Sequence, residues 1–293
     1  MMDRISELPE SLLSGILSYL PVNDSVKTSA LSTRWKNQCL NVPVLEVDLK
    51  YKDVPFLFMT FHEKFLPQLR LQTFKLKSRI VEIDGLKDRI ATVIDHRIQH
   101  LYVKSSVFYR EEGRLLPFVD TMPLNLYTCK TLVSLKLSDS GLHDPGFVSL
   151  PCLKLMHHRD IRWLAPMTLE KLLSGCPLLE ELSLLRGVRL LMRNLWLRGI
   201  VIVCLRMMWL RGIVIISDFL TGISSVRHMI ISQRTVKFML LDIYSQVKVG
   251  PVPKFNNLSR LQAVFASSSL PILPAILESC PNLKHLILVK PIV

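Results

Sequence analysis

A short leucine pattern, C-x-x-L-x-x-L-x-L, recurs along this chain of 293 residues and constrains its fold more than any other feature. It reads CKTLVSLKL from Cys129, CPLLEELSL from Cys176 and CPNLKHLIL from Cys280. In the L-x-L part the two leucines share one face of a short strand, because side chains alternate along a strand. A single copy cannot bury its apolar row, but stacked copies form a continuous core. The pattern therefore predicts a repeat protein built on a parallel sheet.

Looser copies with the same apolar spacing fill most of the remaining sequence, mostly at intervals of about 21–34 residues, with one interval of about 47 that leaves room for two copies. They predict an α/β fold in which an irregular leucine-rich-repeat solenoid carries a curved parallel sheet, with helices or turns behind it. The predicted repeat core contains Leu132, Leu135, Leu137, Leu179, Leu182, Leu184, Leu283, Leu286 and Leu288.

The six cysteines are too few for a disulfide scaffold in a chain of this length. Three of them hold the same repeat position, which favours small buried hydrophobic groups over zinc ligands. Cys152 near His157 and His158 is the nearest candidate for a metal site, but His158 falls at an inward repeat position and is interpreted as a buried histidine. No metal and no cofactor are expected. With no signal peptide at Met1, we expect an intracellular protein, in the nucleus or the cytoplasm.

Lysines and arginines outnumber acidic residues by 37 to 24, a net charge of +13. The densest basic stretch, residues 186–216, has six arginines and no acidic residue, but it is also the most apolar part of the chain. A surface that follows phosphates should instead gather cations on one polar face. Nucleic-acid binding is therefore not favoured, although a basic solenoid that binds nucleic acid or an acidic partner stays open as a third hypothesis.

The same basic stretch contains a tandem duplication, LMRNLWLRGIVIV at 191–203 followed by CLRMMWLRGIVII at 204–216. Thirteen residues are too few for a leucine-rich repeat. The segment from Leu195 to Ile216 has the length of a membrane span, but each of its three arginines costs about 2.5–3.5 kcal/mol at the centre of a bilayer. We therefore expect an inserted duplication and no membrane span.

The first 45 residues predict a separate module of three short helices. Pro9 suits a helix start, apolar residues then recur at helical spacing, and Pro21 ends the run. A second helix carries Val26, and a third would place Leu31, Trp35 and Cys39 on one face. Some 40 residues bury too little surface to be stable alone. The module therefore needs a partner or a following domain.

The segment DRISELPESLLSGILSYLP, followed by VKTSALSTRW, resembles the F-box motif of plant F-box proteins with leucine-rich repeats and a C-terminal FBD region. The family usually carries a second tryptophan where this chain has Cys39. The resemblance implies that the module binds the Skp-type adaptor of a cullin-RING ubiquitin ligase. The residues that it assigns to adaptor binding are Leu8, Pro9, Leu12, Ile16, Leu17, Leu20, Pro21, Val26, Leu31 and Trp35.

The C-terminal part, including FLTGISSVRHMIISQRTVK and LPAILESCPNLKHLIL, is similar to the region that leads into the FBD of the same family. The expected organisation is an F-box at 1–45, a connecting segment at 46–66 and repeats at 67–293 that end in a truncated FBD-like segment.

No glycine-rich phosphate loop, G-x-S-x-G or H-E-x-x-H motif occurs, and no enzyme activity is expected. The resemblance implies a substrate-recruiting subunit of an SCF-type ubiquitin ligase, whose F-box binds the adaptor and, through it, the cullin, while the solenoid binds an unknown target protein. The alternative is an interaction protein outside any ligase, or a decayed copy that no longer binds the adaptor. The duplication, Cys39 and the short C-terminal end favour that alternative.

Overall fold

The computed structural model describes residues 5, 7–20, 22–35, 38–49, 71–78, 86–105, 108–111, 114–117, 121–163, 168–185, 225–232, 254–265, 270 and 273–289. The duplication at 191–216 lies outside them. The chain divides into two compact units, Met1–Leu132 and Val133–Val293. Across the described ranges, no helix is both long and apolar enough to cross a membrane.

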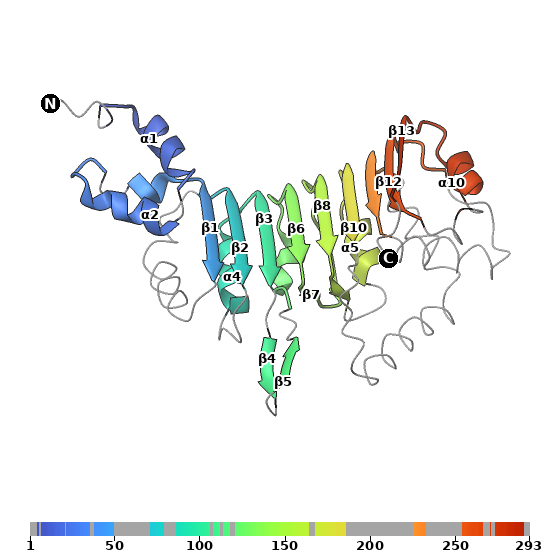
Figure 1. Cartoon of the computed structure of the whole chain (residues 1–293), viewed down its shortest axis with the longest axis horizontal. Helices are drawn as coiled ribbons and strands as arrows, with labels where there is room; N and C mark the ends of the chain where they lie inside the picture. Colours follow the sequence, from blue (N-terminus) through green and yellow to red (C-terminus); the bar gives the residue numbers. More distant parts are fainter. Residues whose placement is uncertain are drawn as a thin grey trace. The chain divides into compact units, whose positions relative to one another are not determined.

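The first unit begins with helices α1 (Glu10–Leu17) and α2 (Val22–Lys27) and the 3-10 turns η1 (Thr28–Ala30) and η2 (Gln38–Asn41). Strands β1 (Val44–Leu49), β2 (Thr73–Ser78) and β3 (His100–Ser105) then pair in parallel in chain order, with α4 (Leu86–Asp95) between the last two (Figure 1). The hairpin β4 (Phe108–Glu111) and β5 (Arg114–Pro117) is antiparallel, and the 3-10 turn η4 (Leu124–Thr128) follows.

The second unit has six strands that pair in parallel in chain order. The short strands β7 (Gly141–Leu142) and β9 (Arg162–Trp163) follow the first two of these strands along the chain and form a separate parallel pair. The described helices of this unit are α5 (Thr168–Ser174) and α10 (Leu273–Ser279). The mixed α/β class with a parallel sheet is therefore confirmed. The six strands are β6 (Ser134–Ser138), β8 (Leu155–Arg159), β10 (Glu181–Leu185), β11 (His228–Ile231), β12 (Arg260–Val264) and β13 (His285–Val289).

One hydrogen-bond arrangement recurs where successive strands begin. The N–H groups of Lys154 and Leu155 both donate to the Val133 carbonyl, at 2.9 and 3.1 Å, and those of Glu180 and Glu181 both donate to the Lys154 carbonyl, at 2.8 and 2.9 Å. The same pairing occurs at the starts of β2, β3, β11, β12 and β13. Each strand therefore starts in the same register as the one before it.

This common register stacks the apolar side chains of successive strands in two buried rows. One row contains Leu135, Met156, Leu182 and Met229, and the other contains Leu137, His158, Leu184 and Ile231. Of the predicted repeat core, six leucines are buried as expected: Leu132, Leu135, Leu137, Leu179, Leu182 and Leu184.

The last predicted repeat departs from this pattern. Leu286 and Leu288 were expected in the core but are 36% and 44% exposed, and Leu283 is half-buried. The physical reason is that β13 has a neighbouring strand only on its β12 side, so that no further repeat of the described chain covers these side chains.

The repeat cysteines Cys129, Cys176 and Cys280 are buried, as their shared position predicts. The Cys176 thiol donates to the Leu172 carbonyl at 2.9 Å. Burial raises the pKa of Cys176 to about 12 and that of Cys280 to about 11, so both remain neutral thiols. Cys152 is exposed, and among the described residues no three His, Cys, Asp or Glu side chains are grouped so that they could hold a metal.

His158 occupies an inward position of β8 and is 2% exposed. Burial, with a smaller contribution from the charge of His157, lowers the pKa of His158 to about 3. The folded protein therefore holds a neutral imidazole in its apolar row, as the repeat position predicts.

This buried imidazole should make the protein sensitive to acid. Below pH 6.5 the unfolded chain protonates His158, while the folded chain does not until about pH 3. Within that window the free energy of unfolding therefore falls by up to about 1.4 kcal/mol for each unit by which the pH is lowered. In urea unfolding at about pH 7 and about pH 4, His158→Leu should lose less stability than the natural protein. A variant at the exposed His285 should lose as much as the natural protein, and an equal loss in His158→Leu would contradict the prediction.

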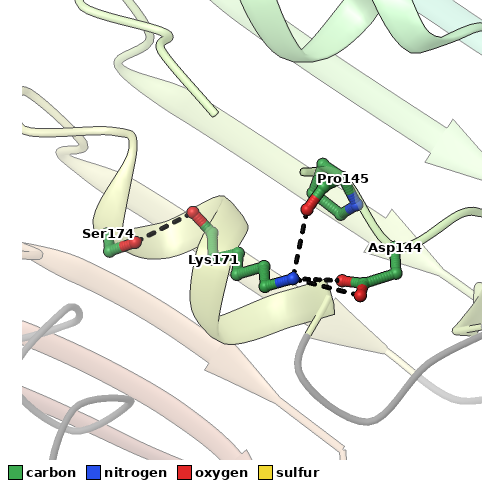
Figure 2. A network of polar contacts seen from close by, with 4 residues as sticks. All are labelled: Asp144, Pro145, Lys171 and Ser174. Atoms are coloured by element: carbon green, nitrogen blue, oxygen red, sulfur yellow. Dashed lines mark hydrogen bonds and ion pairs between the residues drawn. The ribbon is translucent and has the colours of Figure 1, made fainter. Parts of the chain in front are cut away.

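Helix α5 is held to the loop between β7 and β8 by the Lys171 ammonium group. Its Nζ atom donates to both carboxylate oxygens of Asp144, each at 3.0 Å, and to the Pro145 carbonyl at 3.2 Å (Figure 2). The Ser174 hydroxyl donates to the Lys171 carbonyl at 2.9 Å at the end of the helix. The Gly175 carbonyl accepts the Leu150 N–H at 2.9 Å. The loop between β7 and β8 is therefore bonded both to α5 and to the residue that follows this helix.

Gly175 is required by this close approach. A Cβ atom at this position would lie 2.8 Å from the Val148 carbonyl oxygen and 2.4 Å from its Cγ1 atom. Gly175→Ala should therefore destabilise the protein by about 1–3 kcal/mol, and lower the melting temperature by at least about 2 °C. The control is Gly146→Ala, where an added Cβ meets nothing within 4 Å. Equal melting temperatures for the two variants would show that the loop yields without cost.

Candidate protein-interaction site

Large apolar side chains are exposed mainly in two stretches of the described chain, residues 5–31 and residues 270–289. Three others, Leu124, Phe147 and Leu178, are scattered singly. Single exposed apolar residues are ordinary, whereas a concentration of them indicates an interaction surface. The first stretch exposes Ile5, Leu12, Ile16, Tyr19, Leu20 and Leu31.

Helix α1 has two apolar faces with different surroundings. Leu13 and Leu17 are fully buried, while Leu12 and Ile16 are 54% and 44% exposed. The four-residue spacing places Leu12 and Ile16 on one side of the helix, and Leu20 follows in the turn after it. One face of α1 therefore packs inward and the other carries apolar side chains to the surface.

The inward face belongs to a small core made by Leu13, Leu17, Trp35 and Val42, against which Leu8 packs. Cys39 is buried nearby, with its Sγ atom 3.9 Å from the Ser29 hydroxyl. The Arg34 guanidinium donates to the Leu8 carbonyl and so connects the turns at 31–35 to the segment before α1. This core fixes α1 in place and so orients its outer face.

The ends of α1 follow local rules. Pro9 stands immediately before the helix, and its carbonyl accepts the N–H groups of Leu12 and Leu13 at 3.0 and 3.1 Å. The Glu10 carboxylate in the first turn suits the positive end of the helix dipole. At the other end the Ser18 hydroxyl donates to the Gly15 carbonyl at 2.6 Å.

The predicted adaptor-binding residues separate into different environments. Two of them, Leu17 and Trp35, are buried and cannot contact a partner directly while the module keeps this core. Leu8 is half-buried, and Pro21 and the Val26 side chain lie outside the described residues. The exposed ones are Pro9, Leu12, Ile16, Leu20 and Leu31.

Two features differ from the sequence-based expectation. Residues 31–35 form turns, and the helical segment at Gln38–Asn41 is a 3-10 turn, so a third α-helix is not found in the described part of the module. Ile5 and Tyr19 are strongly exposed and were not selected from the sequence. Both lie beyond the ends of α1, but Tyr19 follows Leu12 by seven residues and Ile16 by three, and this helical spacing is the signal that could have found it.

A matched pair of variants tests the two faces of α1. Leu13→Ala leaves a cavity in the small core and should cost about 2–5 kcal/mol, whereas Leu12→Ala removes an exposed side chain and should cost less than about 0.5 kcal/mol. Hydrogen exchange of the α1 amides in the full chain measures this locally. Protection should fall at least about 30-fold in Leu13→Ala and stay close to natural in Leu12→Ala. Similar protection in both variants would contradict the assignment of the inner face.

Comparison with known proteins identifies the N-terminal module. A family model described as the F-box domain matches residues 5–46, which contain both faces of α1 and the whole small core. An FBD-associated F-box protein of Arabidopsis thaliana is 45% identical, over 98% of this chain and 78% of that protein. An F-box/FBD/LRR-repeat protein of the same plant is 46% identical, with the same coverage of both chains.

These matches extend far beyond the F-box. The first runs over 366 aligned residues, more than the 293 of this chain, so that relative has further residues inside the matched region. A match over nearly the whole chain at this identity includes the parallel strands as well as the N-terminal module. The chain belongs to the family of plant F-box proteins with FBD and leucine-rich-repeat regions.

Proposed function

We propose that this protein is a substrate receptor of an SCF-type cullin-RING ubiquitin ligase. The observation that carries the proposal is the two-faced helix α1, whose exposed apolar residues lie inside the segment that matches the F-box domain. Membership of a family named for this domain supports the same assignment.

In this proposal the outer face of α1 binds a Skp-type adaptor. Leu12, Ile16 and Leu20, with Leu31 from the turn after η1, supply apolar anchors of the kind that dominate binding energy at interface centres. Leu17 and Trp35 act indirectly, because they hold the helix in position from inside the core. Cys39 is buried beside this core in place of the family's second tryptophan, so the substitution leaves the proposed docking face itself unchanged.

The remaining strands form the target-binding part, which we assign to an irregular leucine-rich-repeat solenoid. The support is the hydrogen-bond arrangement that recurs at strand starts and the two apolar rows that the register stacks. The outward residues between these rows are free to differ from repeat to repeat, and they are the natural place for target recognition.

Such a receptor performs no bond chemistry in this mechanism. It binds the adaptor through one part and the target through another, and so raises the effective concentration of the target near the ubiquitin-charged enzyme of the assembly. The required properties are two binding surfaces in one chain and enough rigidity within each to hold its partner.

Adaptor binding provides the test. In a pull-down with a purified Skp-type adaptor, the double variant Leu12→Ala/Ile16→Ala should bind at least about 30-fold more weakly, because anchors at an interface centre commonly cost 2 kcal/mol or more each. The matched control is Leu124→Ala/Phe147→Ala, which removes two exposed apolar side chains elsewhere and should bind as the natural protein does.

Two results would contradict the proposal in different ways. Unchanged binding by Leu12→Ala/Ile16→Ala would show that another face meets the adaptor. Absence of binding by the natural full chain would remove the ligase role and favour the alternative of an interaction protein outside any ligase.

A further inference from the structure

Five cationic or imidazole side chains gather where the last three strands begin: Arg227, His228, Arg260, Lys284 and His285. His228, Arg260 and His285 are register partners on the adjacent strands β11, β12 and β13 (Figure 1). Adjacent strands lie about 4.8 Å apart, so the guanidinium-bearing strand has an imidazole-bearing strand on each side within about 5 Å. We call these five residues the cationic strip.

The backbone holds the strip in place. The N–H groups of Ser259 and Arg260 both donate to the Arg227 carbonyl, at 2.9 and 3.1 Å, and those of Lys284 and His285 both donate to the Ser259 carbonyl, at 2.9 and 3.0 Å. All five side chains of the strip are exposed. The next residues along β11 and β12, Met229 and Leu261, are buried, which places His228 and Arg260 on the opposite, outward face.

The strip carries no compensating negative charge within the described residues of these three repeats. Their one acidic residue is Glu278 on α10, and none of the five side chains makes an ion pair with a described residue. The preceding strands differ, because Lys154 pairs with Glu180 at 3.4 Å and His157 with Glu181 at 2.5 Å. Glu181, the register partner of His228, is thus already bound to His157 and marks the boundary of the strip.

We propose that the cationic strip binds an acidic segment of the protein that this receptor recruits, an inference that rests on the proposed function. Carboxylates of such a segment would accept hydrogen bonds from the Arg227 and Arg260 guanidinium groups and from the Lys284 ammonium group, and each imidazole offers an N–H donor in either protonation state. Charge complementarity of this kind determines which partner is selected and how fast it binds.

The neighbouring outward residues favour a protein segment over a nucleic acid. Two positions further along the strands lie Ile230, Gln262 and Ile287, with Val264 and Val289 beyond them. These positions carry no aromatic ring for base stacking and no further cation to follow a phosphate backbone, both of which single-stranded nucleic-acid sites use. They suit an apolar side chain beside the acidic ones, so the expected ligand mixes Asp or Glu with Leu or Ile.

The test uses the full chain and three fluorescent probes in anisotropy titrations at about 0.1 M salt. The probes are an Asp/Glu/Leu peptide of about twelve residues, the same peptide with Asn and Gln in place of the acids, and a single-stranded oligonucleotide of equal charge. The acidic peptide should bind at least about tenfold more tightly than its amide counterpart, and its affinity should fall as salt rises.

Variants locate the binding. Arg260→Glu/Lys284→Glu should weaken the acidic peptide at least about tenfold, whereas Lys87→Glu/Lys130→Glu, the same change of net charge at exposed lysines of the first unit, should leave it unchanged. Arg260→Gln/Lys284→Gln serves where charge reversal impairs folding, as checked by thermal unfolding, and should also weaken binding.

The proposal is overturned if the acidic and amide peptides bind alike, if the two glutamate variants lose binding equally, or if the oligonucleotide binds more tightly than the acidic peptide through the strip. A parallel pull-down with the adaptor separates the two proposals. Adaptor binding without peptide binding would overturn the strip alone, whereas strip-dependent peptide binding without adaptor binding would overturn the ligase role and leave the strip as a docking surface.

Discussion

The pair of backbone amides that donates to one carbonyl at successive strand starts is the interaction on which the rest of each unit depends. Because side chains alternate along a strand, a shift of one residue would turn every leucine of a repeat to the wrong face. The paired amides remove that freedom. Met156 then lies between Leu135 and Leu182, and His158 lies between Leu137 and Leu184. A short L-x-L segment therefore buries two side chains although it spans few residues.

The same constraint creates the outward surface. Once the inward rows are fixed, the residues between them align from strand to strand. Side chains of the same chemical kind at these positions then form a row across adjacent strands. Helix α1 also has one buried and one exposed face, because its 3.6-residue period separates Leu13 and Leu17 from Leu12 and Ile16. In both cases burial of one face determines what the opposite face can present to a partner.

The sequence was sufficient wherever a side chain's environment follows from periodicity. The L-x-L leucines of β6 and β10, the repeat cysteines and His158 are buried as their spacing predicts. It was insufficient where the environment depends on what lies across from a residue. Leu12 and Leu13 are adjacent leucines in one apolar helix, and only the core around Trp35 distinguishes them.

Two further differences have the same origin. The structure has turns at 31–35, where spacing alone suggested a helix. Leu286 has the repeat spacing but no following repeat in the described chain. The need for glycine at 175 likewise arises from Val148, which lies far from it in the sequence.

Net charge illustrates the same distinction between composition and position. The +13 of the whole chain indicates no particular partner, because a net charge does not say where the cations and the carboxylates lie. On β1 and β2, Glu46 lies 2.7 Å from the Lys77 ammonium group and 3.5 Å from that of Lys75, and the hydrogen bond from Lys77 is the main cause that lowers the pKa of Glu46. On β8 and β10, His157 and Glu181 pair in the same way. At β11–β13 the register is unchanged, but the one described carboxylate opposite the cationic strip, Glu181 beside His228, is already paired with His157. Exposed ion pairs contribute little to stability, so the cations of these strands are better explained by what they can bind than by what they hold together.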